Sequence, residues 1–504
     1  MSDHQGYYMS QAYHQLVKRF QKIYRLQHLG AIAGWDLATN MPPGGSEARN
    51  SALAELNTLL HQLITDKDVG DWMKKAESEV TDHDTRRSLE EMAIEYNKSI
   101  IIPDDLIRAQ TLTSNKCEYA WRTQRAENDW MGFSKNLEEV VKLSREEANI
   151  RAISSNISPY NALLELYEPG VNTEQLDILF GDLKTWLPEY IQQAQTKQSS
   201  QQVTEPTTLF SQEAQKALGL DAMKLLGFDF DHGRLDVSTH PFCGGVNEDI
   251  RMTTRYNEES FVEALMGTIH ETGHARYNQN LPKDNPELPI SFYRSMGIHE
   301  GQSLFFEMQL GRSAAFLSLL QPLIVKHLCN GIQTPFASQE NLEKIYTQVH
   351  PGFIRVDADE ITYPAHIILR YEIERDLIEG HIEVKEIPDL WQQKMKDYLG
   401  LDVAGDHKNG CMQDIHWPMG AFGYFPSYTL GAMIAAQLFG AQKNAMPDID
   451  HQIRQGNLSP IFDWLKENIW SQGRRYSTDA LMIRATGESL NASYFQKHLK
   501  QRYL

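Results

Sequence analysis

The chain has 504 residues, and 41 % of them are hydrophobic, which is enough to build a sizeable core. Its formal net charge is −19 at pH 7, so a phosphate backbone or an anionic membrane would be repelled, and neither is expected as a partner. The four cysteines lie far apart and form no CxxC pair, which argues against a disulfide framework and against a cysteine zinc site.

The sequence favours a cytoplasmic protein. Its first residues lack the apolar core of a signal peptide. The longest nearly apolar run, residues 430–441, is too short to span a bilayer and is typical of a buried helix. Free thiols suit a reducing cytosol.

The first 190 residues are predicted to be helical, because apolar residues recur at helical spacing from Tyr13 to Tyr24 and beyond. Pro-Pro-Gly-Gly at 42–45 stops a helix, and a new one is expected near Ser46. Residues 192–206 are polar and of low complexity, which indicates an exposed loop, with a hinge between subdomains as the alternative.

Residues 234–256 change character, since Val, Thr and aromatic residues gather around a Gly-Gly pair. This pattern favours a β-hairpin or two short strands. Helical patterns return at residue 257 and continue to the end of the chain. We therefore expect a mainly α protein, large and helical, with one small β element.

A helix is predicted over residues 257–280, with Asn257 as its cap and Glu258 and Glu259 in its first turn. It contains the segment HETGH at 270–274. The glycine at position 273 is unfavourable inside a helix, so it indicates that another element or a ligand approaches closely there.

The HExxH spacing points to metal chemistry. His270 and His274 lie one turn apart on the same helical face and can present two nitrogens to one ion. Glu271 points about 100° away from His270, so it is placed to reach a water on the ion rather than the ion itself. The alternative is an ordinary helix with two histidines.

A zinc enzyme of this kind needs a third protein ligand and one open position. The helical segment 295–313 offers His299, Glu300 and Glu307. The residues alone favour Glu300 over its neighbour His299, with Glu307 two turns further on, and they leave the choice open.

Six segments occur in an order that resembles the thermostable carboxypeptidase Taq family of metallocarboxypeptidases. They are HPF (240–242), DIRMT (249–253), HETGH (270–274), HEGQS (299–303), IRVDAD (354–359) and GCMQDIHW (410–417). The likeness runs from about residue 20 to the C-terminus. It implies a mostly helical fold with a deep cleft, and it implies a homodimer. We expect one metallocarboxypeptidase domain over residues 1–504, with a division into two subdomains that flank the cleft as one possible arrangement.

The resemblance also implies that Glu300 is the third ligand beside His270 and His274. Zn²⁺ is the expected ion, and Co²⁺ or Mn²⁺ would fit the same ligands. Glu271 would act as the general base toward water and then pass the proton to the leaving amine.

Further site residues are expected in the other motifs. Arg355 is expected to bind the substrate's C-terminal carboxylate, with an internal salt bridge to Asp357 or Asp359 as the alternative. His240 would line the pocket or be structural. A phenol at Tyr424 or an imidazolium at His416 could donate to the oxyanion, although Tyr424 could also be a core aromatic with a satisfied hydroxyl.

The expected function is thus a metal-dependent carboxypeptidase that hydrolyses the C-terminal bond of peptides with broad specificity. The rivals of the same type are an oligopeptidase and a dipeptidyl carboxypeptidase. A different class is a peptide-binding scaffold whose metal site is closed by a fourth protein ligand, and no such ligand stands out nearby.

Overall fold

The computed structural model describes residues 10–238 and 241–504, and it confirms a mainly α fold with a small sheet. The first half of the chain forms helices with these bounds: α1 Gln11–Thr39, α2 Ser46–Thr65, α3 Lys67–Glu79, α4 His83–Ile100, α5 Asp104–Ala126, α6 Trp130–Ser155, α7 Pro159–Leu164, α8 Thr173–Gln198 and α9 Gln212–Leu225. Helix α2 begins at Ser46 with Glu47 in its first turn, as expected from the sequence.

The second half is also helical. Its helices are α10 Val262–Gln279, α11 Met296–Leu304, α12 Ala314–Leu328, α13 Gln339–Tyr346, α14 Tyr363–Ile378, α15 Ile387–Leu399, α16 Pro426–Ala445, α17 Ile449–Arg454, α18 Ser459–Asn468, α19 Thr478–Thr486 and α20 Ser493–Tyr503. The apolar run at 430–441 lies in α16 and is almost entirely buried. Among the described residues, no helix is both long and apolar enough to cross a bilayer.

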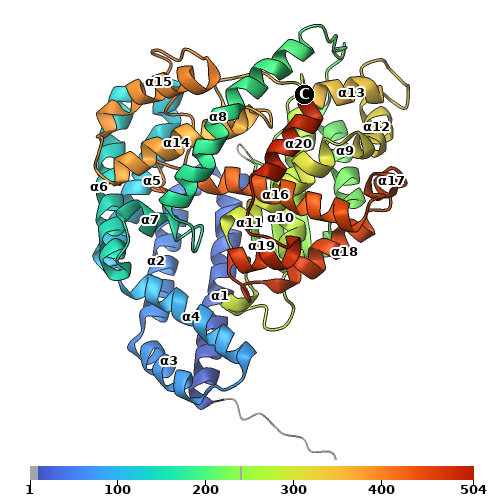
Figure 1. Cartoon of the computed structure of the whole chain (residues 1–504). Coiled ribbons are helices and arrows are strands. Elements are labelled where there is room, and N and C mark those ends of the chain that lie inside the picture. Colours follow the sequence, from blue (N-terminus) through green and yellow to red (C-terminus); the bar gives the residue numbers. More distant parts are fainter. Residues whose placement is uncertain (1–9, 239–240) are drawn as a thin grey trace, which may run out of the picture.

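Among the residues that the structure describes, three hydrophobic clusters underlie this arrangement, and two of them join most of the helices. The larger one extends from Cys117 to Tyr503 and includes α6, α8, α10 to α12, α14 and α16. The smaller one joins α1, α3 and α4 to Leu288 and Ile290 of the second half. Figure 1 shows α3 and α4 in blue at the lower end of the molecule, with α1 and α2 extending from there toward its middle. The division into one domain with two subdomains stays a prediction.

The β element has three strands, where the sequence pattern predicted a hairpin or two strands. They are β1 (Gly233–Val237), β2 (Cys243–Val246) and β3 (Asp249–Thr254), in the order β1-β3-β2. The central strand β3 is parallel to β1 and antiparallel to β2. It packs against α10, which carries the HETGH motif.

Two predicted boundaries were wrong. Helix α8 continues to Gln198, whose side chain bonds the backbone of Thr347 and Val349, so half of the predicted loop is helical. Helix α10 begins at Val262 rather than at Asn257. Asn257 Oδ1 instead accepts a hydrogen bond from the backbone of Glu259, which forms a separate turn before the helix.

Three helices meet closely at the centre of the fold, where α11 packs against both α10 and α16 (Figure 1). Two glycines permit this approach. A Cβ at Gly273 of α10 would lie 2.6 Å from the carbonyl oxygen of Gln302, and a Cβ at Gly431 of α16 would lie 2.7 Å from Cγ of Glu300. The expectation of a close neighbour at Gly273 is therefore confirmed, and this packing sets the depth of Glu300.

Candidate metal centre

Two histidines of α10 and one glutamate of α11 converge in the interior. One ligand atom from each of His270, His274 and Glu300 can be chosen so that all three lie within 4.8 Å of one another. The Nε2 atom of His274 lies 3.3 Å from Oε2 of Glu300, and Nε2 of His270 lies 3.8 Å from Oε1 of the same carboxylate. Both imidazoles thus direct Nε2 toward Glu300.

The opposite nitrogen of His270 has its own partner. Its Nδ1 lies 2.9 Å from Oε2 of Glu307 and donates its N–H there, so in the neutral imidazole Nε2 is the nitrogen left to bind an ion. Burial alone would lower the pKa of the His270 imidazole, but Glu300 and the bond to Glu307 raise it to about 10. The surrounding carboxylates therefore favour positive charge at this point.

His274 is oriented by a chain of two bonds. His299 Nε2 lies 3.0 Å from Oδ1 of Asn278 and donates to it, because an amide oxygen only accepts. Burial holds the pKa of His299 well below its usual range, so its Nδ1 is unprotonated and accepts from Nδ1 of His274 at 2.6 Å. The Nε2 lone pair of His274 is then free on the side of Glu300.

These residues fit a divalent ion. Two neutral imidazoles and one carboxylate form a donor set typical of zinc enzymes, and each imidazole has an outer partner that holds its tautomer. His299 and Glu307, the other candidates for the third ligand, occupy those outer positions instead of facing the ion site.

Glu271 borders the same site but is left without a partner. Its side chain is 7 % exposed, and its Oε2 is enclosed with no hydrogen bond from the described residues. Burial raises the pKa of Glu271, while His270 and His274 oppose this effect. A buried, unpaired carboxylate is costly to keep, and this position suits a proton acceptor rather than a structural role.

Arg355 lies in a buried ion pair with a residue that the sequence reasoning did not consider. Its Nε donates to Asp414 at 2.9 Å, in place of the expected alternatives Asp357 and Asp359. Arg370 binds the other oxygen of Asp414 at 2.7 Å. The two terminal nitrogens of Arg355 have no hydrogen bond among the described residues, so they can still bind a carboxylate.

Tyr428 connects Arg355 to the metal cluster, and the sequence reasoning missed it. The Arg355 guanidinium lies 4.7 Å from the centre of the Tyr428 ring. Burial raises the pKa of the Tyr428 hydroxyl above its usual range, and the negative charges of Glu300 and Glu271 add to the rise. Its spacing of four residues from Tyr424 was the available signal.

Tyr424 and His416 lie beside Tyr428. The Tyr424 ring contacts the rings of Tyr167, His416 and Tyr428 with centroids 5.1–5.3 Å apart, and its hydroxyl has no hydrogen bond within the described part of the chain. His416 Nε2 lies 3.0 Å from the Tyr428 hydroxyl. His240 falls outside the described residues, and its role stays a prediction.

His416 is neutral near pH 7, so the expected imidazolium donor is corrected. Burial lowers its pKa to about 3, and Arg355 adds to the effect. An unfolded histidine titrates near 6.5, so this group stabilises the fold above pH 6.5 and loses that contribution as pH falls toward 3.

Replacing the imidazole should reveal this pH dependence. In the metal-free state, we expect the unfolding free energy of His416→Gln to fall less between pH 7 and pH 4 than that of the wild type. Urea unfolding at both pH values measures the difference. An equal loss of stability in the two proteins would contradict the assignment.

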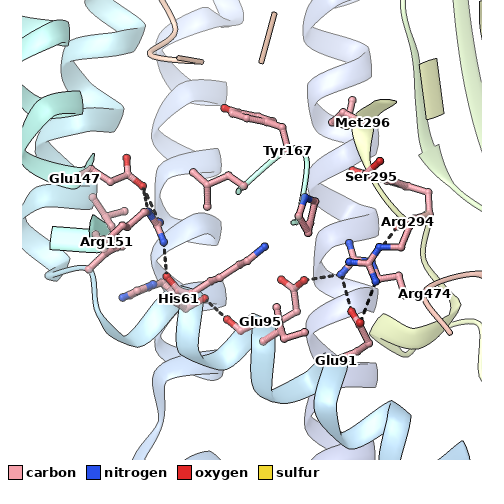
Figure 2. A pocket seen from close by; sticks show the side chains of 18 of the residues that line it. His61, Glu91, Glu95, Glu147, Arg151, Tyr167, Arg294, Ser295, Met296 and Arg474 are labelled. Atoms are coloured by element: carbon pink, nitrogen blue, oxygen red, sulfur yellow. Dashed lines mark hydrogen bonds and ion pairs between the residues drawn. The ribbon is translucent and has the colours of Figure 1, made fainter. Parts of the chain in front are cut away.

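A separate cavity of about 440 Å³ lies between the N-terminal helices and the segment before α11 (Figure 2). Figure 2 shows Glu91 and Glu95 of α4 facing Arg294 and Arg474, at 3.2 Å for Glu91–Arg294 and 2.6 Å for Glu95–Arg474. These ion pairs join α4 to the second half of the chain. The cavity includes Tyr167, which also contacts Tyr424, but none of the three clustered metal-site residues lines it.

The chain is similar to known proteins over nearly its whole length. The family model described as carboxypeptidase Taq (M32) metallopeptidase matches residues 15–503. Carboxypeptidase 1 of Bacillus subtilis is 36 % identical, with 96 % of this chain and 97 % of that protein covered. Thermostable carboxypeptidase 1 of Thermus thermophilus is 34 % identical, with 98 % of each covered.

Solved structures show the same fold. Metallocarboxypeptidase 1 of Trypanosoma cruzi superposes with a TM-score of 0.94 at 44 % identity, covering 98 % of this chain and 99 % of that one. A Pyrococcus furiosus carboxypeptidase superposes with a TM-score of 0.92 at 30 % identity, covering 99 % and 100 %.

Proposed function

Because this chain belongs to the carboxypeptidase Taq family and is a metallocarboxypeptidase, we propose that it releases single C-terminal residues from peptides with broad specificity. The observation that carries the proposal is the convergence of His270, His274 and Glu300 beside the unpaired Glu271. The proposed ion is Zn²⁺, with Co²⁺ and Mn²⁺ as alternatives. His270, His274 and Glu300 would hold a divalent ion, which would polarise the scissile carbonyl and lower the pKa of a water.

Glu271 performs the proton transfers in this proposal. Its carboxylate accepts the proton of the attacking water and later delivers it to the nitrogen of the leaving residue. Low exposure supports both steps, because burial raises the carboxyl pKa toward the range in which a group can take up and release a proton near neutral pH.

Arg355 and the tyrosines would hold the substrate. The free nitrogens of the Arg355 guanidinium bind the C-terminal carboxylate, and Asp414 keeps the side chain in place through its Nε. Tyr424 is the proposed oxyanion donor, because its hydroxyl has no partner within the described residues. His416 supports the neighbouring Tyr428 through its Nε2. A cytoplasmic homodimer acting on peptides completes the proposal.

The free carboxylate is the feature to test. We expect an N-blocked dipeptide to be cleaved in a chelator-sensitive reaction. The same dipeptide with a C-terminal amide should be cleaved at least about 100-fold more slowly, because an amide cannot form the charge-assisted pair with the terminal nitrogens of Arg355. Mass spectrometry of the products of a longer peptide gives the size of the released unit.

Two results would replace the proposal by its rivals. Equal cleavage of the acid and the amide would indicate an oligopeptidase. Release of two residues at a time would indicate a dipeptidyl carboxypeptidase.

A further inference from the structure

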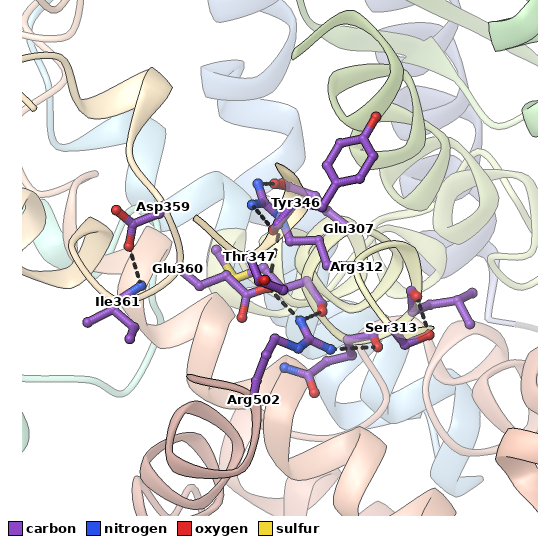
Figure 3. A network of polar contacts seen from close by, with 12 residues as sticks. Glu307, Arg312, Ser313, Tyr346, Thr347, Asp359, Glu360, Ile361 and Arg502 are labelled. Carbon is purple, nitrogen blue, oxygen red and sulfur yellow. Dashed lines mark hydrogen bonds and ion pairs between the residues drawn. The ribbon is translucent and has the colours of Figure 1, made fainter. Parts of the chain in front are cut away.

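A line of buried charges runs from the metal centre to the last helix of the structure (Figure 3). It begins at Glu307, which accepts the Nδ1–H of His270 at 2.9 Å and also binds Arg312 at 2.6 Å. Arg312 Nε lies 3.7 Å from Oε1 of Glu360. Glu360 in turn binds Arg502 of α20 at 2.6 Å.

Glu360 is the centre of this line. Its side chain is fully buried, and it faces Arg312, Arg502 and His498, whose Nε2 lies 2.8 Å from its second oxygen. Glu360 also lies five residues after Arg355 in the same stretch of chain. Glu360 therefore connects helix α20 to His270, through Arg312 and Glu307, and to the stretch of chain that carries Arg355.

Arg502 has a second set of contacts on the backbone that carries Glu307. Residues Phe305–Gly311 form a π-helix directly after α11. The carbonyl groups near the end of a helix lack partners within it, and π-helical turns are frequently found at functional sites. Arg502 donates to two such carbonyls, those of Met308 and Gln309.

Burying these charged side chains costs free energy of folding. Several buried charges must be desolvated, and such a group is often less stable than well-packed apolar residues of the same volume. Because this network of buried charges ends at His270, we take its destabilising effect as a sign that it serves the metal site.

We infer that Arg502 is a positioning residue for the metal centre: through Glu360, Arg312 and the π-helix carbonyls it fixes Glu307, and Glu307 fixes the His270 imidazole. The inference rests on the metal site of the proposed function. Because an outer partner of a metal-bound histidine affects affinity by roughly 10–100-fold, the loss of Arg502 is expected to weaken metal binding measurably.

The test uses the full chain with Arg502→Met, and with Arg151→Met as the matched control. Arg151 and Arg502 have equal side-chain exposure, 13 %. Arg151 also binds a carboxylate, Glu147 at 2.7 Å, and a carbonyl, that of Lys98 at 2.9 Å, but these lie on α6 and α4. The control therefore removes contacts of the same kind, with one carbonyl fewer, without reaching His270.

Zn²⁺ affinity is measured by competition with a chromophoric chelator, and the visible spectrum of the Co²⁺-loaded protein reports ligand geometry. Arg502→Met should bind Zn²⁺ about 10-fold more weakly and change the Co²⁺ spectrum. Arg151→Met should match the wild type in both. Arg502→Lys keeps the positive charge but lacks the planar guanidinium with its several N–H donors, so it should recover only part of the affinity.

The possible outcomes distinguish a failure of this inference from a failure of the proposed metal site. If His270→Ala binds Zn²⁺ as the wild type does, the proposed site fails and the inference with it. If His270→Ala loses the ion while Arg502→Met keeps wild-type affinity and spectrum, the inference alone fails. Should Arg502→Met not fold, Arg502→Lys carries the test, and wild-type affinity in that variant would overturn the inference.

Discussion

Glu271→Gln is expected to retain the metal and to lose kcat by roughly three orders of magnitude, within the 10²–10⁴-fold range of general acid–base catalysis. The amide has nearly the same shape as the carboxylate, so the packing around this 7 % exposed side chain should persist. An amide cannot accept the proton of the attacking water. The loss should therefore fall on kcat, with little change in KM.

The measurement combines steady-state cleavage of an N-blocked dipeptide with metal analysis of the same samples. Glu263→Gln is the matched control, because Glu263 lies on the same helix with an exposed side chain. It should behave as the wild type. Wild-type activity in a metal-loaded Glu271→Gln protein would show that the carboxylate takes no part in the chemistry.

Glu300→Gln is expected to lower Zn²⁺ affinity by more than about 100-fold and to abolish activity at ordinary metal concentrations. The change removes the single carboxylate among the three clustered donors and keeps the side-chain volume that packs against Gly431. This expected loss exceeds the 10–100-fold range typical of outer partners.

His299→Gln and Glu307→Gln provide the comparison, since both were candidates for the third ligand. Their side chains bond to the far nitrogens of His274 and His270, so each variant should bind the ion with only an outer-partner loss. Titration of the three purified variants with Zn²⁺ ranks them by their affinity for the ion. If either of these two lost more affinity than Glu300→Gln, the proposed ligand set would be wrong.

The local secondary structure around the HExxH segment could be predicted from the sequence. The HExxH segment was placed on a helix, and that prediction was confirmed because helical spacing follows from backbone hydrogen bonds between near neighbours. The start of this helix was predicted wrongly. Asn257 was expected to cap it, but the Asn257 side chain stabilises a separate turn before the helix. Whether an asparagine caps a helix or a turn depends on how the chain then packs.

The sequence by itself determined that two histidines would share one helical face and that a glutamate would stand next to them, and it revealed the family through six ordered motifs. Only the tertiary structure decided which of His299, Glu300 and Glu307 faces those histidines, and that Arg355 pairs with Asp414, 59 residues away along the chain. The physical reason is the range of the forces involved. Backbone hydrogen bonding sets the angle between residues one turn apart, whereas the depth of Glu300 depends on the close packing of α10, α11 and α16, which brings together segments that no local pattern relates.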